Sequence, residues 1–121
     1  MLSNDYTNLM TVDAVDMDDS VVLYMVGECD IGTVPALTQE LRRAIVESKH
    51  VVLEVHLLTY IDSTGVSAIA SAQESLVQGK RQLRIVGSHG LFDRIMRLTK
   101  LDGQIPLDNS VDESLAAIGR N

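Results

Sequence analysis

The sequence predicts an α/β fold, in one domain, with a mixed sheet of four to five strands that opens with a β-hairpin and packs against about four helices. Three observations lead to this prediction. The 121 residues suffice for one domain of ordinary size. Two strand-like runs come first, separated by a short polar turn. After them, strand-like runs alternate with segments of helical periodicity, an order that favours parallel pairing.

The opening hairpin is predicted from residues 9–17, which alternate loosely, and residues 21–26, which are apolar and rich in β-branched side chains. An Asp-Asp-Ser cluster between them indicates the turn. Residues 27–33 carry two glycines and two acids, so we expect a surface loop there. Apolar residues at helical spacing then predict a helix, with Thr33 as its N-cap and Pro35 in its first turn.

The middle of the chain predicts a buried strand over residues 51–55, followed by a polar turn. Helical spacing begins again at Val66, and Gly79 is the expected C-terminal cap. Residues 83–86 predict the next strand.

The last part of the chain predicts a helix with Leu91, Ile95 and Leu98 on one face. Residues 105–107 contain a proline, which lacks an N–H donor, so they form at most a short edge strand. Ser110 is the expected N-cap of a final helix. The residues of this final helix that we expect to face inward are Val111, Leu115 and Ile118.

Asp62 and Ser63 stand where the central strand passes into a helix, and the rest of the chain is arranged around this turn. Asp and Ser suit the position because their side chains accept hydrogen bonds from the free N–H groups of the first turn. The same N–H groups and the helix dipole favour added negative charge, such as a phosphoryl group on Ser63 or Thr64. On spacing alone, helix capping is the commoner use of these residues.

Composition limits the function classes. The net charge is -7, which argues against nucleic acid and against an anionic membrane surface as partners. A single cysteine, Cys29, excludes an intrachain disulfide and fits a reducing compartment, and no signal peptide or membrane-spanning run is apparent, so we expect a cytoplasmic protein. His50, His56 and His89 lack ligand spacing, and we expect neither a metal nor a cofactor.

Four motifs together resemble the STAS domain, the sulfate transporter and anti-sigma factor antagonist family, and most closely its stand-alone bacterial anti-sigma factor antagonists. The motifs are Gly27-Glu28-Cys29-Asp30, residues 58–66 with Asp62-Ser63-Thr64-Gly65, residues 83–87, and Leu98-Thr99-Lys100-Leu101. The resemblance covers residues 9–118, with 1–8 expected to be a poorly ordered N-terminus and 119–121 a tail. Cys29 and Lys100 replace the family's usual Leu and Gly.

The resemblance implies an anti-sigma factor antagonist and no enzyme activity. In such families the unphosphorylated antagonist binds an anti-sigma factor that is also a serine kinase of the GHKL ATPase type, and this releases a sigma factor. Phosphorylation of the motif serine, here Ser63 with Thr64 as second choice, switches binding off, and a phosphoserine phosphatase restores it. The partner-binding residues implied are Asp30, Asp62, Ser63, Thr64, Gly65 and Ser67.

Two alternatives remain from the sequence. The chain could be a STAS scaffold or sensory module that binds another histidine-kinase-like partner without sigma-factor control. A serine hydrolase would need a nucleophile elbow of the G-x-S-x-G kind, and residues 61–65 lack its first glycine.

Overall fold

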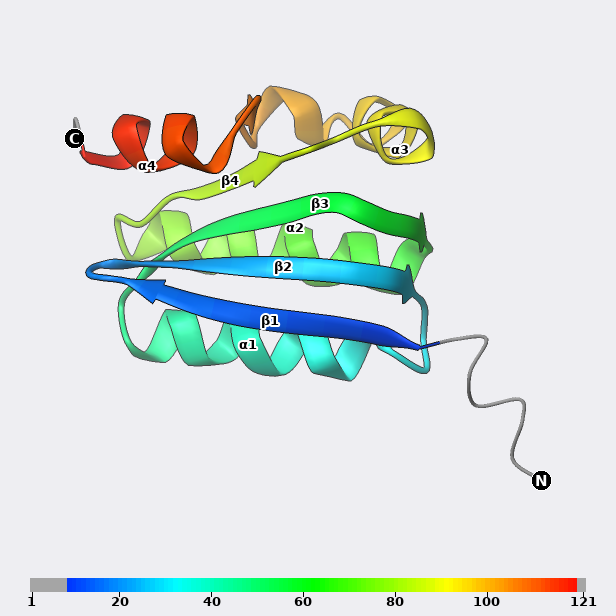
Figure 1. Ribbon diagram of the computed structural model, residues 1–121, viewed down its shortest axis with the longest axis horizontal. Helices are drawn as coiled ribbons and strands as arrows, with labels where there is room; N and C mark the ends of the chain where they lie inside the picture. Colours follow the sequence, from blue (N-terminus) through cyan, green and yellow to red (C-terminus); the bar gives the residue numbers. More distant parts are fainter. Residues whose placement is uncertain (1–8, 120–121) are drawn as a thin grey trace.

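The computed structural model describes residues 9–119, which form a five-stranded sheet with helices on both faces (Figure 1). The strands lie in the order β1-β2-β3-β4-β5. Strand β1 (Met10–Met17) pairs antiparallel with β2 (Ser20–Cys29), and the other neighbours pair in parallel. The predicted mixed sheet with an opening hairpin is therefore confirmed. The predicted tails, residues 1–8 and 119–121, fall outside the described residues except for Gly119.

Each further element follows the predicted order. The bounds are α1 (Val34–Val46), β3 (His50–Ile61), α2 (Ser63–Gln78), β4 (Leu83–Val86), α3 (Gly90–Leu98), the short 3₁₀ helix η2 (Leu101–Gly103), β5 (Leu107–Asp108) and α4 (Val111–Gly119).

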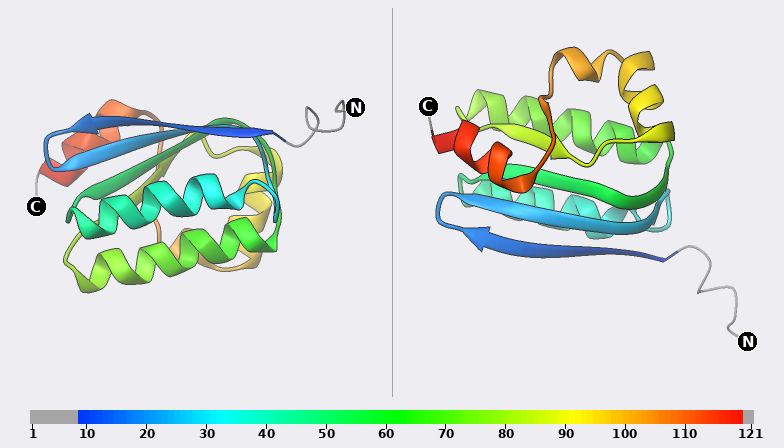
Figure 2. Two further views of the ribbon diagram at one scale, coloured as in Figure 1. Left: turned by 90° about the horizontal axis from the view of Figure 1, so that it is seen from below. Right: turned by 45° about the horizontal axis from the view of Figure 1, so that its top comes forward.

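Helices α1, α2 and α3 cover one face of the sheet, and α4 covers part of the other (Figure 2). The main core lies under the first three helices and is almost wholly aliphatic, as the low aromatic content requires. It is built from alternate residues of the strands, since neighbouring side chains in a strand point to opposite faces. A smaller cluster joins Val22, Val52 and Val86 to Ile118 of α4. Ser110 caps α4 through the N–H of Glu113, as predicted.

The predicted loop at residues 27–33 is wrong in its first half, because β2 continues to Cys29. Gly27 adopts φ +109 beside a shift in register, and a Cβ there would lie 2.3 Å from the carbonyl oxygen of Leu9. The glycine thus permits a close backbone approach within the strand and does not end it. Thr33 stands at the N-cap of α1, but its hydroxyl donates to the carbonyl of Glu28 (2.7 Å) and makes no cap bond.

Three further boundaries or faces differ from prediction. Strand β3 extends to Ile61, six residues beyond the predicted end, because it pairs with the lengthened β2. In α3 the buried residues are Phe92 and Met96, while Leu98 is exposed. Strand β5 begins at Leu107, and the carbonyl of the preceding proline accepts a bond from Ile85.

Candidate functional site

The predicted site lies where β2 and β3 end and where α1 and α2 begin, at one end of the sheet (Figure 1). Parallel strands bring their carboxyl ends to the same edge, which is where open α/β sheets commonly bind their ligands. The two strand ends are joined directly, because the N–H of Asp62 donates to the carbonyl of Cys29 at 3.1 Å. The Asp30 and Asp62 segments, far apart in sequence, therefore lie side by side.

Asp62 is the N-cap of α2, as predicted. Its Oδ1 accepts from the N–H of Thr64 at 2.9 Å and from the N–H of Gly65 at 3.4 Å. The pKa of Asp62 lies below its usual value, chiefly because the Thr64 hydroxyl donates to it, with backbone N–H groups of Gly65, Thr64 and Ile31 adding to the effect. Asp62 is therefore a fixed negative charge at the helix start.

The hydroxyls of Ser63 and Thr64 differ in their surroundings. The hydroxyl of Thr64 donates to Asp62 Oδ1 at 2.5 Å, and the residue is half-buried. Ser63 is exposed, and within residues 9–119 its hydroxyl makes no hydrogen bond. The structure thus leaves Ser63 available to another protein while Thr64 serves the cap.

Asp30 belongs to a tight turn between β2 and α1. Its Oδ1 accepts from the N–H groups of Gly32 (2.9 Å) and Thr33 (3.1 Å), and its own N–H donates to the Thr33 hydroxyl. The backbone N–H of the adjoining Ile31 contributes to lowering the Asp62 pKa. The structure therefore brings Asp30 to the same end of the sheet as Ser63, although its carboxylate also holds its own turn.

Gly65 is buried at the first turn of α2. A Cβ at this position would lie 2.7 Å from the sulfur of Cys29 and 2.7 Å from Cγ1 of Ile61. Cys29 is itself buried, and burial together with the carboxylates of Asp62 and Asp30 raises the pKa of its thiol to about 11. Gly65 therefore acts by letting the helix pack closely on the strand ends, and Cys29 is a buried thiol of low reactivity.

A groove of about 480 Å³ runs from Ser63 across to α3. On the α2 side it is lined by Ser63, Val66 and the exposed Ser67, which stands one turn after Ser63. On the α3 side it is lined by Ile95, Leu98 and Thr99. Leu98 is 75% exposed, although its helix buries other apolar side chains. An exposed leucine beside an apolar groove is typical of a surface that another protein covers.

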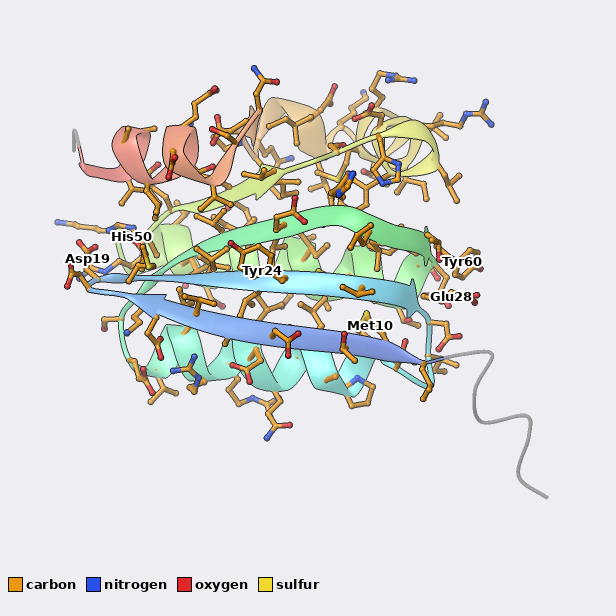
Figure 3. All side chains as sticks on the ribbon, in the orientation of Figure 1. Met10, Asp19, Tyr24, Glu28, His50 and Tyr60 are labelled. Carbon is orange, nitrogen blue, oxygen red and sulfur yellow. The ribbon has the colours of Figure 1, made fainter. Side chains whose placement is uncertain are left out.

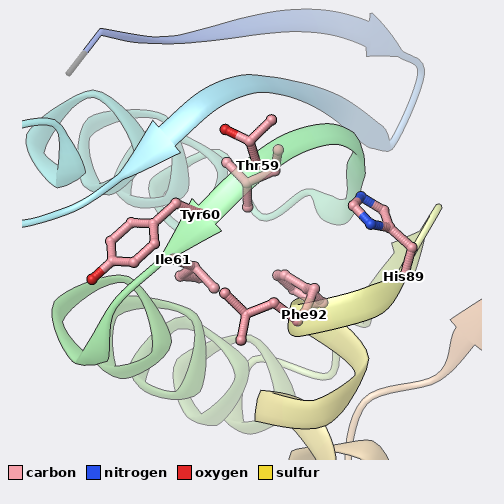
Figure 4. A pocket seen from close by; sticks show the side chains of 7 residues that line it. Thr59, Tyr60, Ile61, His89 and Phe92 are labelled. Atoms are coloured by element: carbon pink, nitrogen blue, oxygen red, sulfur yellow. The ribbon is translucent and has the colours of Figure 1, made fainter. Parts of the chain in front are cut away.

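The α3 residues of this groove were not predicted as site residues. Leu98 and Ile95 were expected on one apolar face of a helix, where the prediction could not distinguish packing from binding. The available signal was that α3 carries two adjacent apolar stripes, of which one helix face can bury only one. A second pocket of about 300 Å³ shares Ile61 with the groove, and Figure 4 shows Phe92 close to it and His89 farther along its wall.

Two classes of site are not found in the described residues. Within residues 9–119, no group of three or more His, Cys, Asp or Glu side chains is placed to hold a metal ion. Over the same residues, no helix has both the length and the hydropathy that crossing a bilayer requires.

Comparison with known proteins identifies the family. A family model of the STAS domain matches residues 11–114. The chain belongs to the STAS-domain family. Among solved structures, an anti-sigma factor antagonist from Mycobacterium paratuberculosis is 27% identical, with a TM-score of 0.83, and the match covers 94% of this chain and 97% of that one.

Two structures of SpoIIAA, the second described as a Bacillus cell fate determinant, share the STAS fold with this chain. The unphosphorylated form, an anti-sigma factor antagonist, is 16% identical with a TM-score of 0.72, over 93% of this chain and 99% of that one. The phosphorylated form is 14% identical with a TM-score of 0.72, over 91% and 99%. This STAS domain thus has its exposed serine at the start of α2, beside an apolar groove that α3 completes.

Proposed function

We propose that this STAS domain is an anti-sigma factor antagonist whose binding is controlled by phosphorylation of Ser63. In its unphosphorylated form it binds an anti-sigma factor that is a serine kinase of the GHKL type, and a sigma factor is released. The kinase phosphorylates Ser63, which ends binding, and a phosphoserine phosphatase reverses the change. One observation carries the proposal: Ser63 is exposed and unbonded at the start of α2, next to an apolar groove.

The similarity to the Mycobacterium paratuberculosis antagonist supports the choice of partner class, because it extends over nearly the whole of both chains. Because the proposed partner controls a sigma factor, we expect the protein to act in the cytoplasm. Asp30, Asp62, Gly65 and Ser67 enter the proposal in different ways. Ser67 and Asp62 line the groove, whereas Asp30 and Gly65 hold the turn and the helix start in position.

Ser63 is preferred over Thr64 as the acceptor for a physical reason. Attack on a phosphoryl donor requires a hydroxyl that is accessible and can turn towards the donor. Transfer to Thr64 would break its 2.5 Å bond to Asp62 and place a phosphoryl group directly against that carboxylate. Transfer to Ser63 breaks no hydrogen bond of the described structure.

Phosphorylation of Ser63 would weaken binding because it adds charge to a surface that must lose its water when the partner binds. A phosphoryl group brings about -1.5 to -2 charges. Asp62 next to it is already ionised and uses its Oδ1 to accept from the first-turn N–H groups, so these donors are not free to neutralise the added charge. An unpaired charge in a dry interface costs several kcal/mol, and each ~1.4 kcal/mol is tenfold in affinity.

Phosphorylation is best tested by incubating the chain with the cognate anti-sigma kinase and ATP and mapping the modified residue by mass spectrometry. We expect a single phosphate on Ser63 and none in a Ser63→Ala variant. Ser71→Ala is the matched control, since it removes an exposed serine of the same helix that does not line the groove, and it should leave phosphorylation unchanged. A phosphate on Thr64 or elsewhere contradicts the assignment.

Binding is tested by calorimetry with the anti-sigma factor, comparing Ser63→Ala with Ser63→Asp. We expect Ser63→Ala to bind like the unmodified chain and Ser63→Asp to bind at least about tenfold more weakly. Equal affinities would contradict the charge argument. A kinase-like partner that binds the chain but holds no sigma factor would instead support the scaffold or sensory function.

A further inference from the structure

The face of the sheet opposite α1 and α2 is only half covered. Helix α4 lies over β3, β4 and β5, and Figure 1 shows no helix in front of β1 and β2. Parallel strands are usually buried on both faces, so an uncovered β2–β3 pair is uncommon. We call the uncovered part, formed by β1, β2 and β3 from Glu54 onwards, the open face.

The open face carries exposed apolar side chains that come together from three strands. Tyr24, Val26 and Leu57 lie on this face because they stand next to Met25 or Leu58, which are buried in the main core. Val15 and Met17 lie on it because they pair in register with Val22 and Ser20, which point to the same side of β2 as Tyr24. The exposed side chains therefore extend across all three strands, and Val26 pairs in register with Leu57. The exposed members are Val15, Met17, Tyr24, Val26 and Leu57.

A row of two carboxylates and one aromatic ring crosses the middle of the open face. Asp13 is paired in register with Tyr24, and Tyr24 with Glu54. One oxygen of Glu54 accepts from the N–H of His56 at 3.1 Å, and its other oxygen lies beside Gly87. Figure 3 shows Tyr24 midway along β2 with no helix in front of it. Within the described strands, the one arginine or lysine placed on this face is Arg84, and Asp108 holds it with two hydrogen bonds (2.7 and 3.1 Å). The row therefore has no cation of its own.

This row suits an arginine or lysine from another molecule. Side chains directly opposite in neighbouring strands have their Cβ atoms about 4.5–5.5 Å apart. A cation above the Tyr24 ring can therefore contact the face of the aromatic ring and the Asp13 carboxylate, and the negative charge of Glu54 lies on its other side.

Helix α4 shows what kind of segment fits this face. It packs on the sheet through Val111, Leu115 and Ile118, which are four and three residues apart. Strands lie about 4.8 Å apart and a helix is about 10 Å wide, so one helix covers about two strands. The open face therefore has room for one more helix beside α4.

A second copy of this chain fits the open face poorly. A two-fold dimer would bring the Asp13 and Glu54 carboxylates of one copy near those of the other, in a protein whose net charge is -7. Edge pairing through β1 is likewise disfavoured, because this edge strand carries Asp13 and Asp16, and charged side chains on an edge strand oppose pairing with another chain.

We propose that the open face binds a basic amphipathic helix of a partner protein. An arginine or lysine of that helix binds the Asp13–Tyr24–Glu54 row, and its apolar residues cover Val15, Val26 and Leu57. This surface belongs to the opposite side of the sheet from the groove beside Ser63, so the two can be occupied independently.

The test is a phage-displayed library of helical peptides about four turns long, selected on the whole chain. We expect enriched peptides to carry a Lys or Arg between apolar residues spaced three and four apart. The variant Asp13→Asn with Glu54→Gln removes both charges with little change in shape, and we expect it to weaken these peptides at least about tenfold. Leu98→Ser, in the groove beside Ser63, is the matched control and should leave their affinity unchanged.

Several outcomes would overturn the proposal. They are a selection without enriched peptides, acidic enriched peptides, or peptides whose affinity the charge-removing variant leaves unchanged. Self-association in sedimentation experiments that is lost in Tyr24→Ser would show that a second copy occupies the face. None of these results bears on Ser63, whose phosphorylation and partner binding are measured separately.

Discussion

Replacing Gly65 by alanine tests how tightly the start of α2 is packed on the sheet. The new Cβ would lie 2.7 Å from the Cys29 sulfur and 2.7 Å from Cγ1 of Ile61. Ordinary carbon contacts are about 3.5–4.0 Å, so both neighbours or the helix must move by about 1 Å. Overpacking of this kind costs about 1–3 kcal/mol, and the better helix propensity of alanine returns up to ~1 kcal/mol. We expect Gly65→Ala to lower the free energy of unfolding by about 1–2 kcal/mol.

Urea unfolding followed by circular dichroism measures this loss. Gly79→Ala is the matched control, because it adds the same methyl group to the end of the same helix, where the nearest heavy atom is 3.6 Å away. Its effect should be small. Cys29→Ala removes the sulfur that the new methyl group meets, so the double variant with Gly65→Ala should lose less stability than the sum of the two single changes. Strict additivity, or a Gly65→Ala variant as stable as the native chain, would refute the packing argument.

Two further predictions concern titratable groups. Arg84 and the hydroxyl of Ser114 both donate to Asp108, and the bonds from Arg84 are the main reason why the pKa of Asp108 lies below its usual value. This stabilisation is full above the unfolded pKa of about 3.9 and is lost as pH falls through the lower folded pKa. Asp108→Asn should therefore cost about 1–3 kcal/mol of unfolding free energy near neutral pH and nothing in strong acid, and a pH-independent difference in urea titrations would contradict this. Because Cys29 is fully buried and burial raises its pKa to about 11, a thiol reagent should modify the native chain only as fast as it unfolds, and rapid modification would show that the thiol is accessible.

Local patterns predicted most of the fold. Helical spacing gave the buried side of α1, where Leu37, Leu41 and Ala44 are inside, and α4 was predicted in the same way. The order of strands and helices gave the parallel pairing. These features depend on neighbouring residues, and hydrophobic periodicity reports such short-range order directly.

The incorrect predictions depend on contacts between distant residues. The end of β2 contains Gly27 and Glu28, and its sequence alone resembles a loop. In β3 the polar residues Glu54 and His56 interrupt the apolar run, which hid the strand-like residues after them. Both segments form strand because they pair with each other. In α3, a stripe through Leu98 and a stripe through Phe92 are equally apolar, and the position of the sheet decides which is buried.

The candidate site shows the same division. The capping role of Asp62 was predictable, because an acid between a strand and a helix is a local signal. The groove beside Ser63 was not, because α2 and α3 meet there from segments about thirty residues apart. The hydrogen bond from the Thr64 hydroxyl to Asp62 depends on side-chain geometry, which local patterns do not report. This bond distinguishes Thr64 from Ser63, the two candidate acceptors that the sequence offers.

At the start of α2, the residues that hold the helix in place are different from the proposed phosphorylation site, Ser63. Asp62 alone caps the helix, and Gly65 alone sets its distance from the strands. The side chain of Ser63 is exposed and makes no hydrogen bond within residues 9–119. A charge added to Ser63 therefore leaves the bonds that hold the helix in place, and it changes only what an approaching protein meets. If the proposed phosphorylation takes place, the partner would for that reason detect it through desolvation and repulsion at the interface, and no second conformation of this domain would be required.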